Sequence, residues 1–143
     1  MKFWMWNNQP IKSHKDLPDC ITHIVYKIYY TDGTVYVGYK AIRGEKRLKP
    51  TKAQLAIRKN YKRVETKELP FVQYVGSSAE NKGKTILMKE ILHLTTNKRT
   101  ATYLENKILF TEGAIEQSPV NNFNNKNIGG KWYDNCLDGL YKG

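Results

Sequence analysis

The chain has 143 residues, which is the size of a single folded domain. Hydrophobic residues make up 40% of it and charged residues 26%, an ordinary composition for a globular protein. It contains no run of 18 apolar residues, which excludes a predicted membrane-spanning helix. The formal net charge is +11, and such an excess attracts polyanions, of which nucleic acid is the commonest. This balance argues against a purely structural protein, whereas a solvated lysine-rich surface or a membrane-surface binder stays open.

Residues 1–22 have no sustained hydrophobic period and are expected to form an extended arm that packs its tryptophans onto the body. The runs 23–30 and 35–40 are rich in β-branched and aromatic residues, and Asp32-Gly33 lies between them. This pattern predicts a β-hairpin.

Residues 41–50 are basic and irregular in pattern. Thr51 can cap a helix that runs to about Arg63. The exposed side of this predicted helix carries a basic stripe, which we expect to bind nucleic acid, at Arg58, Lys59 and Lys62.

Residues 85–94 have strand character, and Asn97 begins the clearest helix, which is expected to end near Gly113. Residues 129–143 read as a tail. The sequence therefore predicts an α/β (α+β) domain with a small three-stranded antiparallel sheet and flanking helices.

Two motifs in the hairpin, Val25-Tyr26 and Tyr36-Val37-Gly38, make the chain resemble the GIY-YIG nucleases, although Ile24 stands where the family carries glycine. Basic residues, a strand, a helix with Glu105 and an asparagine-rich loop follow in the family's order over residues 23–128. The order resembles the phage-encoded branch, which includes homing endonucleases. The resemblance implies an endonuclease that cuts double-stranded DNA with Mg²⁺ or Mn²⁺.

The resemblance also implies roles for individual residues. Tyr26, with its pKa lowered by neighbouring charge or acting through water, would accept a proton from the attacking water, and Tyr36 would orient the water or the phosphate. Arg47 would neutralise the scissile phosphate, with Arg43 as the runner-up. Lys40 is a secondary candidate for a phosphate contact or for proton transfer.

A second Tyr-Val-Gly begins at Tyr74, 48 residues after Tyr26 and too far along the chain for a tight hairpin partner. We expect this segment to be structural, or to contact DNA through Ser77 and Ser78.

Glu105 lies at the edge of an apolar stripe formed by Ala101, Leu104 and Ile108. A carboxylate near a core needs a partner, because burial of an unpaired charge is costly, and Mg²⁺ is a suitable one. Two alternatives stay open. Thr102 and Glu105 could form a capping box if the helix begins later, and Glu112 also lies near the stripe.

Beyond this helix, the family places an asparagine near the site, and Asn121 fits the spacing best, with Asn122 next. Cys20, Cys136 and the three histidines lack the spacing of a zinc site.

The main alternative is a non-catalytic basic protein of the same fold that binds DNA or RNA, and a nuclease acting on RNA is the third reading. Cleavage of both strands by one site would require a dimer or two sequential nicks. The N-terminus lacks the features of a signal peptide, so we expect a cytoplasmic protein, in the host cell if a phage encodes it. The sequence does not decide among gene mobility, host DNA degradation and restriction.

Overall fold

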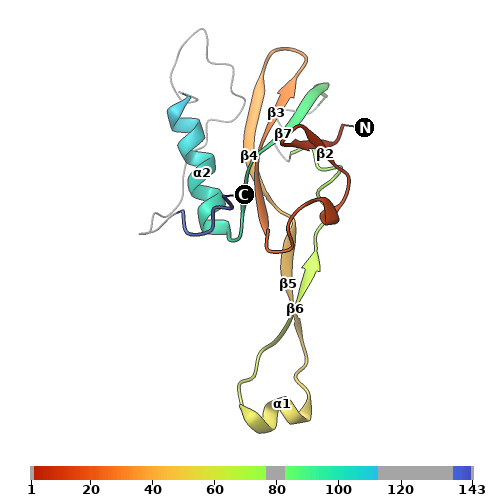
Figure 1. Ribbon diagram of the computed structural model, residues 1–143, viewed down its shortest axis with the longest axis vertical. Coiled ribbons are helices and arrows are strands. Elements are labelled where there is room, and N and C mark those ends of the chain that lie inside the picture. The colour runs from red at the N-terminus through yellow and green to blue at the C-terminus, as the bar shows by residue number, and fades with distance from the viewer. Residues whose placement is uncertain (1, 77–82, 113–136, 143) are drawn as a thin grey trace.

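The computed structural model describes residues 2–76, 83–112 and 137–142. In this part of the chain a five-stranded sheet has the order β2-β1-β7-β3-β4, and a separate two-stranded ribbon pairs β5 with β6 (Figure 1). The elements are β1 (Trp4–Trp6), β2 (Gln9–Ile11), the 3-10 helix η1 (His14–Asp16), β3 (His23–Tyr30), β4 (Val35–Ala41), β5 (Arg43–Leu48), α1 (Lys52–Ile57), β6 (Arg63–Glu68), β7 (Ile86–Thr95) and α2 (Lys98–Thr111).

The predicted hairpin is confirmed as β3 and β4, which pair antiparallel with Tyr26 opposite Gly38. In its turn Gly33 adopts a φ of +87°, a conformation that residues with a side chain rarely adopt. The Asp32 carboxylate also stabilises the turn by accepting a hydrogen bond from the Thr34 backbone N–H. The predicted strand 85–94 is β7, and it pairs antiparallel with β3 on the other side.

The N-terminal residues add two strands to this sheet, which therefore has five strands instead of the expected three. Strand β1 pairs parallel with β7, and β2 folds back onto β1 through a turn in which Asn7 and Asn8 both have positive φ. Asparagine tolerates this conformation better than most residues. Trp4 is fully buried, and its indole Nε1 donates to the Phe71 carbonyl at 2.7 Å.

The sequence prediction was wrong between residues 41 and 63. Instead of an irregular stretch and one long helix, the chain forms β5, the six-residue α1 and β6. Thr51 does cap α1, in a capping box with Gln54. The helix ends at Ile57 because no residue of α1 is buried, and a short helix without tertiary packing is marginal in water.

The two faces of the five-stranded sheet pack against different partners. Helix α2 covers one face, where Ala101 and Leu104 lie against Val25 of β3 (Figure 1). The main core lies on the other face, where Trp4 and Phe71 pack with Tyr26 and its neighbours. No helix among the described residues is long and apolar enough to cross a membrane.

Candidate active site

Helix α2 holds Glu105 in a fixed register. Asn97 is its N-cap and accepts a hydrogen bond from the Thr100 backbone N–H at 2.8 Å. Thr102 lies inside the helix, where its hydroxyl donates to the Lys98 carbonyl. The alternative that Thr102 and Glu105 form a capping box is therefore wrong, and the position of Glu105 is not explained by capping.

Glu105 is half-buried, and burial raises the pKa of its carboxyl to about 7. Within the described residues no lysine or arginine forms a salt bridge with it. The other candidate on this helix, Glu112, is paired with the Lys27 ammonium at 3.3 Å. Glu105 is thus the α2 carboxylate whose ionised form burial disfavours, and no cation among the described residues forms a salt bridge with it.

The hairpin brings Tyr26 and Tyr36 together with their ring centroids 6.2 Å apart. The Tyr26 phenol lies directly over Gly38: a Cβ at that position would be 2.7 Å from the Tyr26 hydroxyl oxygen and 3.1 Å from the Tyr36 ring. The glycine of the second motif is therefore a steric requirement for the tyrosine of the first. Tyr36, unlike the buried Tyr26, is partly exposed.

Tyr74 joins this pair, which sequence reasoning missed. Its ring lies edge-on to Tyr26 with centroids 6.0 Å apart, and the two side chains share a hydrogen bond. The Lys40 ammonium lies over the Tyr74 ring, 5.1 Å from its centroid. The Lys89 ammonium holds the Tyr74 segment in place by donating to the Val72 and Tyr74 carbonyls, each at 2.9 Å.

Burial and the two neighbouring tyrosines act on the ionisation of Tyr26. Burial, then the neighbouring phenols of Tyr74 and Tyr36, and finally the charge of Glu105 raise the pKa of Tyr26 well above its ordinary value. The expectation of a lowered pKa is therefore wrong for the protein by itself. Glu105 is carried by α2, which covers the opposite face of the sheet from Tyr26, and its charge is the smallest of the causes that raise this pKa.

Strand β4 supplies the side chains that surround the Tyr26 hydroxyl. Strand β4 is the edge of the sheet, and Gly38 leaves that edge without a side chain beneath the Tyr26 hydroxyl. Alternation along β4 places Tyr36 and Lys40 on the same face as Gly38. The result is a cluster of three phenols and one ammonium at a sheet edge, and these groups can hydrogen-bond and neutralise a phosphate.

Comparison with protein families agrees with this geometry. Residues 4–128 match the family model described as "Putative endonuclease segE, GIY-YIG domain". The chain belongs to the GIY-YIG endonuclease family. No curated protein matches it. No solved structure matches it either.

The GIY-YIG match begins at residue 4 and therefore includes β1, in addition to residues 23–128 that carry the sequence motifs. Burial of Trp4 in the main core gives the physical reason, because the sheet and this segment share one hydrophobic interior.

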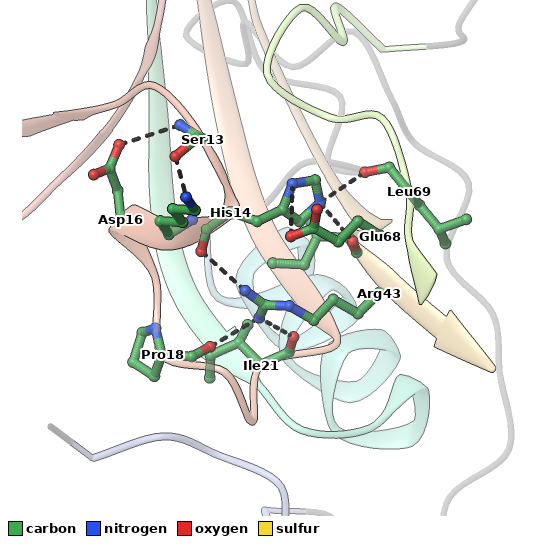
Figure 2. A network of polar contacts seen from close by, with 10 residues as sticks. Ser13, His14, Asp16, Pro18, Ile21, Arg43, Glu68 and Leu69 are labelled. Atoms are coloured by element: carbon green, nitrogen blue, oxygen red, sulfur yellow. Dashed lines mark hydrogen bonds and ion pairs between the residues drawn. The ribbon is translucent and has the colours of Figure 1, made fainter. Parts of the chain in front are cut away.

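The predicted arginines do not join the tyrosine cluster of this GIY-YIG domain. Arg43 is buried, and its guanidinium donates to the carbonyls of Pro18, Ile21 and His14 at 2.8–2.9 Å (Figure 2). The expectation that it binds nucleic acid is therefore wrong. Arg47 is exposed and pairs with Val64 in the ribbon that points away from the sheet. Among the described residues, Lys40 is the cation whose ammonium lies over a ring of this cluster.

The remaining predicted residues fall into two groups. Arg58, Lys59 and Lys62 are exposed, as expected of a contact surface, and lie beside α1 rather than on a long helix. Asn121, Ser77 and Ser78 lie outside the described residues.

Proposed function

We propose that this GIY-YIG domain is a divalent-metal-dependent endonuclease that hydrolyses phosphodiester bonds in double-stranded DNA, with Glu105 as the protein ligand of the metal. The proposal is carried by one observation: the Glu105 carboxylate is half-buried and has no salt bridge among the described residues. The family match and the charge of +11 support the same reading.

The donor chemistry at Glu105 fits Mg²⁺ or Mn²⁺. The described residues contain no group of three His, Cys, Asp or Glu side chains that could enclose an ion. Mg²⁺ does not need such an enclosure, since it commonly binds one or two carboxylates, water and substrate phosphate oxygens. Bound there, the ion would stabilise negative charge on the phosphate and on the leaving oxygen.

The chain's own side chains have separable roles in this proposal. Tyr26, with its raised pKa, stays protonated and positions substrate or water through its hydroxyl instead of acting as the base. Tyr36 is the more exposed phenol and orients the attacking water. The Lys40 ammonium, held over the Tyr74 ring, places positive charge near the scissile phosphate in place of Arg47.

The test is a plasmid-nicking assay with Mg²⁺, with EDTA, and with Glu105→Gln in Mg²⁺. We expect Glu105→Gln to reduce cleavage by about a hundredfold or more, because it removes the charge that binds the metal at almost constant volume. Glu112→Gln is the matched control on the same helix, and it should cleave at close to the wild-type rate. DNA binding by Glu105→Gln in EDTA should equal that of the wild type.

Three outcomes would oppose the proposal. Full activity in Glu105→Gln would rule out Glu105 as the metal ligand. Salt-sensitive DNA binding with no cleavage under any condition would favour the non-catalytic binding protein. Faster cleavage of RNA of the same sequence would replace DNA as the substrate. The oligomeric state, the cytoplasmic location and a role in gene mobility stay predictions.

A further inference from the structure

The ribbon β5–β6 and helix α1 form a projecting arm, defined here as residues 44–67. In Figure 1 it extends away from the five-stranded sheet, with α1 at its far end. No residue of α1 or β6 is buried, so neither element contributes to a core. A two-stranded ribbon with no packed face is marginally stable by itself, which points to a partner as the source of its remaining contacts.

The arm carries most of the protein's excess charge. Its 24 residues include nine lysines and arginines and two glutamates, a net +7 of the whole chain's +11. The other residues together therefore have a net charge of only +4. Positive charge concentrated on a ribbon without a core indicates a surface that binds a phosphate backbone, rather than a merely solvated surface.

Apolar side chains are exposed at the end of the same arm. Ile57 is 86% exposed and Leu55 44% exposed, and the basic residues Arg58 and Lys59 follow directly. An apolar residue among cations on a narrow projection is suited to a DNA groove, where sugars and base edges offer apolar contact between the phosphates.

The root of the arm is fixed to the nuclease domain by buried polar contacts (Figure 2). The His14 ring Nε2 contacts the carbonyls of Ile42 and Leu69, one at each root strand, at 2.8 and 2.9 Å. The Arg43 guanidinium binds three further carbonyls there. The arm therefore leaves the domain in a set direction.

We propose that the arm binds duplex DNA about one helical turn from the scissile phosphate and sets the minimum length of substrate; the proposal rests on the nuclease function above. Strand β5 and the three residues before α1 span about 30 Å at roughly 3.3 Å per residue. One turn of duplex is about 34 Å. The arm and the tyrosine cluster would thus contact the same duplex at two separated points.

The test measures binding, so that it does not depend on cleavage. All proteins carry Glu105→Gln and are titrated in EDTA with two duplexes, one of about 30 base pairs and one of about 8. The arm variant removes three charges near α1, and the control removes three exposed charges from the N-terminal segment. The variants are Arg58→Gln, Lys59→Gln and Lys62→Gln against Lys2→Gln, Lys12→Gln and Lys15→Gln.

On the long duplex we expect the arm variant to bind about a hundredfold more weakly at 0.15 M salt, as counterion release predicts for three lost phosphate contacts. The slope of log affinity against log salt should fall by about 2.7. The control should lose less than about threefold. On the short duplex, which cannot reach the arm, wild type and arm variant should bind alike. Ile57→Ser should also weaken binding to the long duplex only.

Equal losses in the arm variant and the control would show a general electrostatic field and overturn the proposal. So would equal affinity of wild type and arm variant for the long duplex. Stronger binding of the arm to RNA than to duplex DNA would overturn the assignment of the partner. Because every protein here lacks Glu105, failure of the nuclease proposal would be seen in the nicking assay and not in these titrations.

Discussion

Substitution of Gly38 by alanine tests whether a glycine is required at this position to leave space for the Tyr26 side chain. The new Cβ would be 2.7 Å from the Tyr26 hydroxyl oxygen and 2.9 Å from Cζ, closer than side chains tolerate. Overpacking of a filled core costs about 1–3 kcal/mol, and replacing a strand glycine recovers roughly 0.5–1 kcal/mol. We therefore expect a net loss of about 1–2 kcal/mol in the free energy of unfolding.

For a chain of this size the melting temperature should fall by roughly 3–6 °C. Displacement of the Tyr26 phenol should also reduce plasmid nicking by about tenfold or more, since small misplacements of catalytic groups are costly. Urea denaturation and calorimetry measure the first effect. Adding Tyr26→Phe removes one of the clashing atoms, so the cost of Gly38→Ala should shrink by about 0.5–1 kcal/mol in that background.

Gly44→Ala is the matched control on strand β5. Its Cβ would meet Leu69 at 3.5 Å, an ordinary contact, so stability should stay the same or rise by a few tenths of a kcal/mol. If both substitutions destabilise equally, the cost comes from the strand backbone and the steric explanation for Gly38 fails. Normal stability together with normal nicking in Gly38→Ala would refute it as well.

Two further predictions concern buried cations. Burial lowers the pKa of the Lys89 ammonium to about 8 from an unfolded value near 10.5. Between these two values the unfolded chain binds more protons than the folded one, so the free energy of unfolding should rise with pH from 8 to about 9.5. Lys89→Met should flatten that rise when the free energy of unfolding is measured by urea titration at each pH. A wild-type profile that Lys89→Met leaves unchanged would contradict this. Arg43→Met leaves three carbonyls without their hydrogen-bond donor and should lower the free energy of unfolding by about 2–4 kcal/mol. DNA affinity, measured below the melting transition, should stay within about threefold of the wild type. A large loss of affinity without destabilisation would instead show that Arg43 contacts DNA.

Local patterns determined the parts of the fold that depend on near neighbours. Asp32-Gly33 between two β-branched runs predicts the β3–β4 hairpin because the turn and both strands lie within 19 residues. Asn97 and the apolar stripe of α2 similarly predict the helix that carries Glu105. Both predictions required only chain-local hydrogen bonds and side-chain periodicity.

The projecting arm could not be predicted from such local patterns. Strand β6 is exposed along almost its whole length, so it has no alternation of apolar and polar residues to reveal a strand. The same absence of a pattern hid the difference between Arg43, which turns into the buried root, and Arg47, which is exposed on the ribbon. The tertiary contacts of the Arg43 guanidinium with the carbonyls of the segment from His14 to Ile21 distinguish the two arginines.

The sequence by itself determined the hairpin, the helix with its acidic residue and the overall positive charge, because composition, turns and periodicity are properties of short segments. The tertiary structure decided which distant groups meet. It brought Tyr74 to Tyr26 across 48 residues, added β1 to the sheet through the burial of Trp4, and placed Lys40 rather than Arg47 beside the phenols. These contacts depend on packing between segments far apart in the chain, and no local pattern encodes that packing.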